Sequence, residues 1–291
     1  MSDLLSNLVT IMVRKRNCES YEGEELRRLQ LVELGLLREF DRVCRKNGIQ
    51  YSICAGTLLG AVRHKGFIPW DDDADIAMLR EEYERFKTVA DQLNPDICFF
   101  QDHDLEKEYL WGYGKIRKTG TIAMRAGQEH IPCRDGCYID VFPLDYVPDS
   151  LLGQMFLDFK CFVYRKILWS KVAEKTESGV RRLFFSLLAK IPAEYVYNQI
   201  EKIRKRNRSH DRVRILLFPS FGKLYVKNPL NRRYSMPREW FLELAEYEFE
   251  DCLLYGTKDY DGMLKYMYED YMTPPPPDKR LPKVSFSRLE Y

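Results

Sequence analysis

Apolar side chains recur along the first half of the chain with a spacing that alternates between helical and extended. A helical period predicts a long amphipathic helix over residues 24–47 and shorter helices over 58–64 and 79–93. Short apolar runs predict strands at 49–55, 97–100, 111–117 and 138–142, and a partial alternation of acidic and other residues predicts one at 71–78. This alternation indicates an α+β region built around a mixed sheet, which we place at residues 1–150.

The pattern changes after residue 150. Residues 151–206 read as mostly helical, with large apolar side chains interleaved with Lys and Arg. We therefore expect a second, mainly helical region over 151–291 that completes the functional site. The basic and aromatic segment 151–214 fits a peripheral contact with an anionic membrane, and equally an ordinary helical subdomain with solvated charges.

Composition and charge narrow the class of protein. Of 291 residues, 45% are hydrophobic and 31% charged, and 46 basic against 44 acidic residues leave a net charge of +2, so we expect no nucleic-acid partner. No apolar run is long enough to span a bilayer, and the residues after Met1 lack the features of a secretory signal. Eight cysteines fall mostly within apolar runs, which favours free thiols and a cytoplasmic location.

The segment from Asp71 to Asp75 carries the clearest chemistry in the chain. In an extended segment alternate side chains share a face, so Asp71, Asp73 and Asp75 are expected to point the same way. Clustered carboxylates repel one another unless a cation lies between them, and Mg²⁺ is an oxygen-binding cation that leaves coordination positions for phosphate. The alternatives are a solvated acidic loop or a calcium loop, although the EF-hand pattern needs Gly where Ile76 stands.

Two further features flank this segment. Gly56-Thr57 lies between a predicted strand and a predicted helix, where backbone N–H groups and a hydroxyl can bind an anion, or simply form a turn. Asp140 stands inside an apolar strand, where a carboxylate must bind metal, act as a base or be paired. Asp145, at the strand exit, is expected to act as a turn or cap residue. A phosphate cradle beside a metal is the arrangement that phosphoryl transfer requires.

Two other groups of residues have weaker signals. The spacing of His130, Cys133 and Cys137 loosely fits zinc, but no fourth ligand is evident nearby. Four aromatic residues can form a face for a quaternary ammonium, or belong to the core: Trp70, Trp111, Tyr113 and Tyr138.

The stretch 58–70, with Gly56-Thr57 before it and the acidic residues 71–76 after it, closely resembles the signature of the LicD family. That family includes bacterial phosphocholine transferases and fukutin-related ribitol-phosphate transferases. The resemblance covers most of the chain and is loose over 151–235. It departs at Ala74, where a bulkier aliphatic residue is usual, and at Glu269, where Gly is usual.

The resemblance implies a nucleotidyltransferase-type core and an Mg²⁺-dependent (or Mn²⁺-dependent) transfer of a phospho-alcohol from a CDP-alcohol onto a glycan hydroxyl, with release of CMP. By resemblance, Asp73 and Asp75 are the metal-binding D-x-D pair and Asp140 is the third catalytic and metal-binding carboxylate. Candidate ligands for the donor phosphates are Gly56, Thr57, Arg63, Lys115 and Arg117.

The same resemblance implies the substrates. The donor is expected to be CDP-choline, or the ribitol or glycerol counterpart. The acceptor is expected to be a cell-envelope glycan or lipid-linked glycan, as in lipopolysaccharide or teichoic acid biosynthesis, reached at the inner face of the cytoplasmic membrane.

Three other functions use the same acids. A nucleotidyltransferase moves NMP and releases pyrophosphate instead of CMP. A glycosyltransferase uses a D-x-D pair for a nucleotide-sugar and forms a glycosidic bond without new phosphorus. A non-enzymatic envelope scaffold binds Ca²⁺ at the acid cluster, and it predicts a metal-dependent melting shift without turnover of any CDP-alcohol.

Overall fold

A mixed sheet forms the centre of the computed structural model, which describes residues 23–207, 210–219, 234–282 and 284–291. The main path of the sheet has the order β3-β4-β6-β2-β1-β10-β9, and β7 and β8 extend it from β6. A separate ribbon pairs β5 with β11. The strands of the main path are β1 (Ser52–Ile53), β2 (Asp75–Leu79), β3 (Cys98–Gln101), β4 (Gly114–Lys118), β6 (Tyr138–Val147), β9 (Leu244–Phe249) and β10 (Cys252–Thr257). The others are β5 (Ile122–Arg125), β7 (Arg212–Arg214), β8 (Met236–Pro237) and β11 (Phe286–Glu290).

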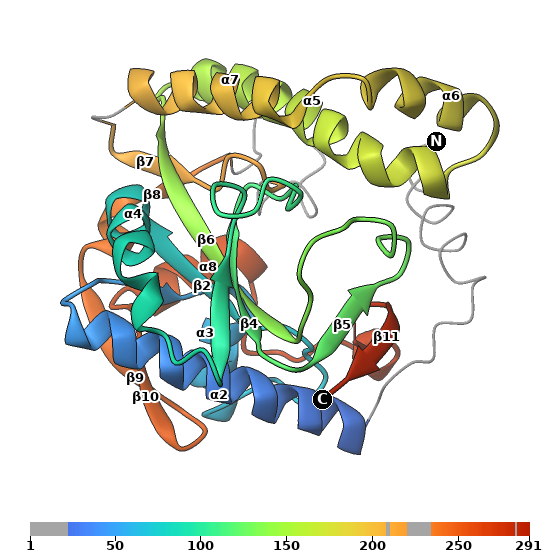
Figure 1. Ribbon diagram of the computed structural model, residues 1–291. Helices are drawn as coiled ribbons and strands as arrows, with labels where there is room; N and C mark the ends of the chain where they lie inside the picture. The colour runs from blue at the N-terminus through green and yellow to red at the C-terminus, as the bar shows by residue number, and fades with distance from the viewer. Residues whose placement is uncertain (1–22, 208–209, 220–233, 283) are drawn as a thin grey trace.

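Helices cover this sheet in two groups. The first half of the chain contributes α2 (Glu24–Lys46), α3 (Ala55–His64) and α4 (Arg80–Val89). The second half contributes α5 (Leu151–Thr176), α6 (Gly179–Leu188), α7 (Ala193–Arg206) and α8 (Tyr260–Tyr268). Figure 1 shows α5, α6 and α7 gathered at one end of the molecule and α2 running across the other, with the long strand β6 between them.

The α+β class, the mixed sheet and the helices over 151–206 are confirmed. After those helices the chain returns to the main sheet, where β10 pairs in parallel with β1 through Ile53 and Gly256.

Among the described residues, no helix combines the length and apolar character needed to span a bilayer. The described cysteines are free thiols, as expected, and Cys18 lies outside the described residues.

Two predicted boundaries are wrong near the acidic segment. The strand expected from Asp71 begins only at Asp75, because Asp is a poor strand former and residues 71–74 form a loop. The helix expected from Leu58 begins at Ala55, whose φ of 48° is unusual for a residue other than Gly. Gly56 and Thr57 therefore belong to the first turn of α3.

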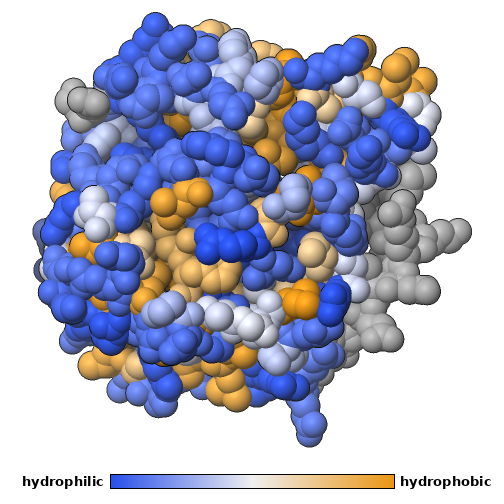
Figure 2. Space-filling model, viewed as in Figure 1, coloured by the Kyte–Doolittle hydropathy of each residue, from blue (hydrophilic) through white to orange (hydrophobic). Residues whose placement is uncertain are grey.

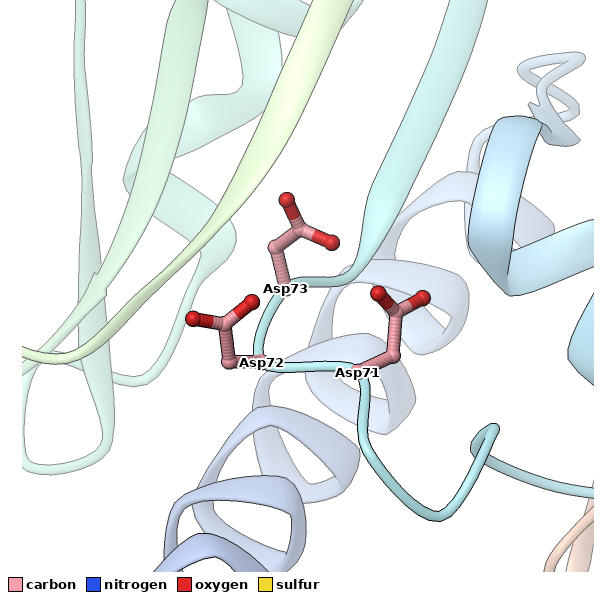
Figure 3. A group of neighbouring side chains, drawn as sticks. All are labelled: Asp71, Asp72 and Asp73. Atoms are coloured by element: carbon pink, nitrogen blue, oxygen red, sulfur yellow. The ribbon is translucent and has the colours of Figure 1, made fainter. Parts of the chain in front are cut away.

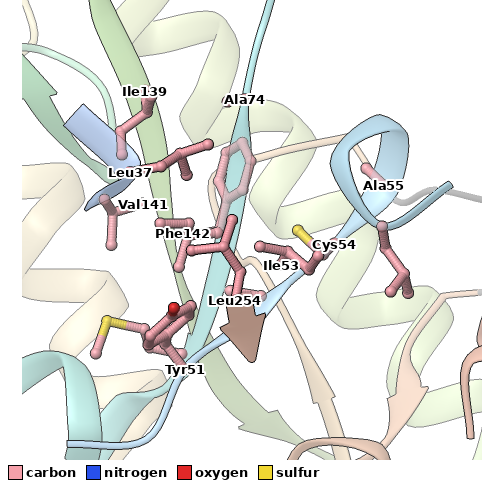
Figure 4. Packing of buried hydrophobic residues seen from close by; sticks show 14 of the residues in the cluster. Leu37, Tyr51, Ile53, Cys54, Ala55, Ala74, Ile139, Val141, Phe142 and Leu254 are labelled. Carbon is pink, nitrogen blue, oxygen red and sulfur yellow. The ribbon is translucent and has the colours of Figure 1, made fainter. Parts of the chain in front are cut away.

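One apolar core fixes the position of the strands that carry the acids. Leu36, Leu37 and Phe40 on α2 are completely buried and belong to the same cluster as Ile53 and Ile76 in the sheet. Figure 4 shows this packing from close by. Because a shift of one residue in a strand would turn its apolar side chains away from the core, burial also fixes the register of β2 against β6.

A buried ion-pair cluster ties the helical end of the molecule to the sheet. The carboxylate of Asp145 in β6 accepts hydrogen bonds from Arg80 Nε at 2.7 Å and from Arg204 Nε at 3.1 Å. The side chain of Asp145 is 2% exposed. The expectation that Asp145 is a turn or cap residue is therefore wrong, because its partners come from α4 and α7, far away in sequence.

Replacing Asp145 with Ala is expected to lower the free energy of unfolding by about 3–5 kcal/mol, because two guanidinium groups lose the buried carboxylate that they share. The two arginines outweigh burial and lower the pKa of Asp145 below its ordinary value of 3.8. The ion pairs therefore stabilise the fold fully above about pH 3.8, and this stabilisation is lost as the pH falls through the lowered pKa of Asp145. Denaturant unfolding measures both effects. Asp91→Ala, at an exposed position, is the control, and equal stability of the two variants would contradict the assignment.

Candidate active site

Three consecutive carboxylates gather in the loop before β2 (Figure 3). One oxygen from each of Asp71, Asp72 and Asp73 lies within 4.8 Å of the other two, and among the described residues this is the group of acidic, His or Cys side chains that is close enough to hold a metal ion together. Asp71 and Asp72 are buried, whereas Asp73 is half-buried. Because the segment is a loop, Asp72 joins its neighbours instead of pointing to the opposite face.

Contacts from distant parts of the chain hold this loop. The amide of Gln30 on α2 donates to the carbonyl oxygens of Ile68 and Asp71 at 3.2 and 2.9 Å. The backbone N–H of Val284 donates to Asp72 Oδ2 at 2.7 Å. The loop is therefore positioned by the two ends of the described chain as well as by its own strand.

The first turn of α3 lies directly against Asp71. A Cβ atom built on Gly56 would stand 2.2 Å from Asp71 Oδ2, so the absence of a side chain at residue 56 lets the carboxylate approach. The N-terminus of a helix carries partial positive charge, which stabilises an anion at this position. The predicted cradle thus lies beside the acidic loop.

Asp75 and Asp140 occupy paired positions on the neighbouring parallel strands β2 and β6. The Asp140 N–H donates to the carbonyl of Ala74 at 2.9 Å, and the Asp75 N–H donates to the Thr57 hydroxyl at 2.8 Å. Side chains at paired positions leave a sheet on the same face. The structure therefore places Asp75 and Asp140 side by side. Asp75 follows Asp73, the last acid of the loop, by two positions. Metal binding by Asp73, Asp75 and Asp140 stays a prediction.

Asp140 has a cationic neighbour, Lys115. The two residues are paired across β4 and β6, and Lys115 Nζ forms an ion pair with Asp140 Oδ1. The ammonium lies 3.3 Å from the centroid of the Tyr138 ring. Burial lowers the pKa of Lys115 to about 7, although the charge of Asp140 favours the ammonium. A phosphate near Asp140 would have to share this ammonium with the carboxylate.

The two predicted arginine ligands are already engaged with protein acceptors. Arg117 donates to the Gln101 side chain, the Asp135 carboxylate and the Gly136 carbonyl, and it is 6% exposed. Arg63 donates to the carbonyl of Tyr271 at 2.7 Å and to His64 at 2.9 Å. Their contact with phosphate stays a prediction.

Sequence reasoning missed Glu33, a buried acid that faces the same cluster. It lies on the apolar face of α2 and is 2% exposed, and its Oε2 atom has no hydrogen-bond partner among the described residues. Burial, followed by the charges of Asp73, Asp72, Asp71 and Asp75, raises the pKa of Glu33 well above its ordinary value of 4.5. The sequence signal for Glu33 was its spacing: it lies four residues after Leu29 and four before Leu37, which places an acid in the apolar stripe of the helix.

Tyr268 on α8 also faces these acids. Burial and then the charges of Asp71, Asp75 and Asp73 raise the pKa of its hydroxyl well above 10.0. A neutral phenol beside carboxylates can donate a hydrogen bond to them. The site therefore draws on α2, α3, α8, the acidic loop and the sheet.

Replacing Glu33 with Gln is expected to stabilise the metal-free protein at neutral and basic pH. A raised pKa means that folding favours the protonated acid, so stability falls as pH rises from 4.5 through the raised value, and the neutral amide does not have this dependence. Thermal unfolding in EDTA from about pH 5 to about pH 8 measures the difference. Glu25→Gln, exposed on the same helix, is the control. Parallel pH curves for wild type and Glu33→Gln would show that folding does not raise the pKa of Glu33.

The residues of the predicted zinc site and of the predicted aromatic face do not come together. His130 Nε2 is hydrogen-bonded to the Lys171 carbonyl at 2.9 Å, and the described residues show no metal-binding group made of His130, Cys133 and Cys137. Trp70 packs against His64 and Arg280, whereas Trp111 and Tyr113 line a cavity beside α5. The ring of Tyr138 is covered by Lys115.

The acidic loop and the part of the mixed sheet around it fall within a known domain. Residues 48–166, which span α3, the acidic loop, β4 and β6, match the family described as "LicD/FKTN/FKRP, nucleotidyltransferase domain". The chain is 30% identical over 268 residues, 88% of its length, to the lipopolysaccharide cholinephosphotransferase LicD of Haemophilus influenzae, of which the match covers 95%. The chain therefore belongs to the LicD family.

Two shorter matches are to uncharacterized proteins of Rickettsia. The chain is 42% identical over 72 residues to one from Rickettsia typhi, and 44% identical over 84 residues to one from Rickettsia prowazekii. These matches cover 25% and 29% of this chain, and 23% and 29% of the two relatives.

Proposed function

We propose that this protein transfers phosphocholine from CDP-choline to a hydroxyl of a cell-envelope glycan and releases CMP, with ribitol or glycerol phosphate as the alternative cargo. The observation that carries the proposal is the acidic loop against the first turn of α3, next to Asp75 and Asp140 on adjacent strands. The name of the Haemophilus relative supports phosphocholine as the first cargo to test and lipopolysaccharide as an acceptor.

The residues present fit a hard divalent cation. The donors are carboxylate oxygens, and Glu33 adds a buried oxygen without a hydrogen-bond partner in the described part of the chain. Asp73, which belongs to the group of three neighbouring carboxylates, and Asp75 would hold Mg²⁺ or Mn²⁺, with Asp140 as the third ligand. Asp75 and Asp140 lie outside that group, on the adjacent strands β2 and β6. When bound, the ion would supply positive charge against the donor diphosphate and the leaving CMP.

The protein's own groups then account for binding and proton transfer. Backbone N–H groups of the first turn of α3 would bind the diphosphate, as helix N-termini do. Asp140 would orient the acceptor hydroxyl or take its proton as that oxygen attacks the phosphorus next to the alcohol. A phosphodiester forms, the bond to CMP breaks, and Lys115 neutralises charge beside Asp140.

Product analysis tests this function. The purified chain, with CDP-choline, a glycan acceptor and Mg²⁺, is expected to release CMP, and EDTA is expected to stop the release. Pyrophosphate as product would indicate NMP transfer, and a new glycosidic bond would indicate a glycosyltransferase. Metal-dependent melting without turnover of any CDP-alcohol would indicate the scaffold.

We also propose that the helical end of the protein contacts the inner face of the cytoplasmic membrane. Four exposed apolar residues form one stripe on α6: Val180, Leu183, Phe184 and Leu187. Arg181 and Arg182 lie on the same helix, a combination typical of helices at an anionic interface. Figure 2 shows apolar side chains at the edge of the molecule over α6.

Changing Phe184 to Glu is expected to abolish co-sedimentation with anionic vesicles at low salt, because a charge replaces an exposed apolar contact in the stripe. Leu253→Glu, exposed on β10, is the control and should still bind. CMP release with a soluble acceptor should not change in either variant. Wild-type protein that stays in solution with anionic vesicles would exclude the membrane contact.

A further inference from the structure

A cavity of about 690 Å³ lies between α5 and the segment that leads into β4. Aromatic rings of Trp111, Tyr113, Phe162 and Trp169 form much of its wall. Its volume is in the range of small-molecule sites. Among the described residues of the wall, the charged side chains are all cationic.

The three cations of this wall, Arg125, Arg165 and Lys166, form no ion pair with a carboxylate within the described ranges. Arg125 Nε donates to the Tyr138 hydroxyl at 2.7 Å, and Arg165 Nη1 donates to the Phe218 carbonyl at 2.9 Å. Lys166 Nζ lies 5.5 Å from the centroid of the Phe162 ring. Burial lowers the pKa of Arg165 and of Lys166. Half-buried cations that form no ion pair are costly, so Arg125 and Arg165, with the exposed Lys166 beside them, favour an anion in the cavity.

The cavity is connected to the candidate active site by direct contacts. Arg125 in its wall binds the Tyr138 hydroxyl, the Tyr138 ring contacts Lys115, and Lys115 pairs with Asp140. A molecule in the cavity therefore lies on the β4 side of Asp140. The acidic loop and α3, where the donor diphosphate is expected to bind, lie on the opposite side of Asp140, because β2 is the neighbour of β6 opposite to β4.

We infer that this cavity binds an anionic amphiphile, with a phosphate group among Arg125, Arg165 and Lys166 and an apolar portion against Trp111 and Trp169. Guanidinium groups suit phosphate oxygens, and the aromatic walls suit a hydrocarbon chain. If the proposed function holds, this is the acceptor subsite, and the acceptor is a glycan carried on an acidic lipid rather than a free neutral sugar. The binding itself does not depend on turnover or on metal.

Titration of the full chain in EDTA tests the inference, with quenching of tryptophan fluorescence as the signal because two tryptophans line the wall. The probes are octyl phosphate below its micelle concentration, octyl glucoside and inorganic phosphate. Octyl phosphate is expected to bind at least about tenfold more tightly than either of the others. Equal binding of octyl glucoside would mean a purely apolar cavity, and equal binding of inorganic phosphate would mean a free-phosphate site. Either result overturns the inference.

Variants locate the probe. Arg165→Gln and Lys166→Gln are each expected to weaken octyl phosphate binding about five- to tenfold. Lys160→Gln, whose ammonium lies over Phe156 on the same helix, is the control. Unchanged affinity in both cavity variants, with folding verified by circular dichroism, would refute the site. Displacement of the probe by CMP would assign the cavity to the donor and also refute it. Because no step needs catalysis, absence of CMP release would leave these results intact.

Discussion

Asp73→Asn is expected to lower the rate of transfer by at least about a thousandfold, which corresponds to about 4 kcal/mol of transition-state stabilisation. Asparagine keeps the shape of the side chain and removes the charge that would hold a divalent cation. The side chain is half-buried in a loop, so the fold should remain and the melting temperature should change little. CMP release and thermal unfolding, measured on the same preparation, test the two parts.

The matched control for Asp73→Asn is Asp96→Asn, which removes one carboxylate at an exposed position. It should keep wild-type turnover. Isothermal titration with Mn²⁺ adds a measurement that does not depend on activity, and we expect the Asp73 variant alone to lose affinity. Full turnover in Asp73→Asn would remove this residue from the catalytic assignment.

Gly56→Ala is expected to reduce transfer by about a hundredfold, with a smaller effect on stability. The new Cβ would lie 2.2 Å from Asp71 Oδ2, so the carboxylate must turn away from the first turn of α3. Moving the end of a side chain costs the fold little, but a displacement of about 1 Å at an active site can cost a factor of this size. Steady-state kinetics and thermal unfolding separate the two effects.

Gly35→Ala is the control, because a Cβ at residue 35 of α2 meets no atom within 4 Å. It should leave activity unchanged and add up to about 1 kcal/mol of stability, since Ala favours a helix more than Gly does. A Gly56→Ala enzyme with wild-type kinetics would mean that the position of the Asp71 carboxylate does not matter for transfer.

Local patterns predicted the elements whose signal is local. The helices α2 and α5 to α7 were expected from apolar spacing over long segments, and β3, β4 and β6 from short apolar runs. The start of β2 was placed four residues too early. Side-chain alternation describes an extended chain, whereas Gln30 and Val284, distant in sequence, hold residues 71–74 as a loop.

Contacts between residues that are distant in the sequence could not be predicted. The juxtaposition of Asp75 with Asp140 depends on parallel pairing of strands separated by more than fifty residues, which no local pattern specifies. Asp145 was misjudged for the same reason, because Arg80 and Arg204 come from separate helices. The charge on the apolar face of α2 at Glu33 was visible in the sequence, but its acidic neighbours were not.

The pairing of β1 with β10 has a consequence for synthesis of the protein on the ribosome. Strand β1 has only two residues and lies between β2 and β10, which follows it by about two hundred positions. Until the last fifth of the polypeptide emerges, β1 is an uncovered edge next to the strand of Asp75, and such edges promote aggregation. A truncated product that ends after the family domain would keep every predicted catalytic acid and still lack the neighbour that completes their sheet.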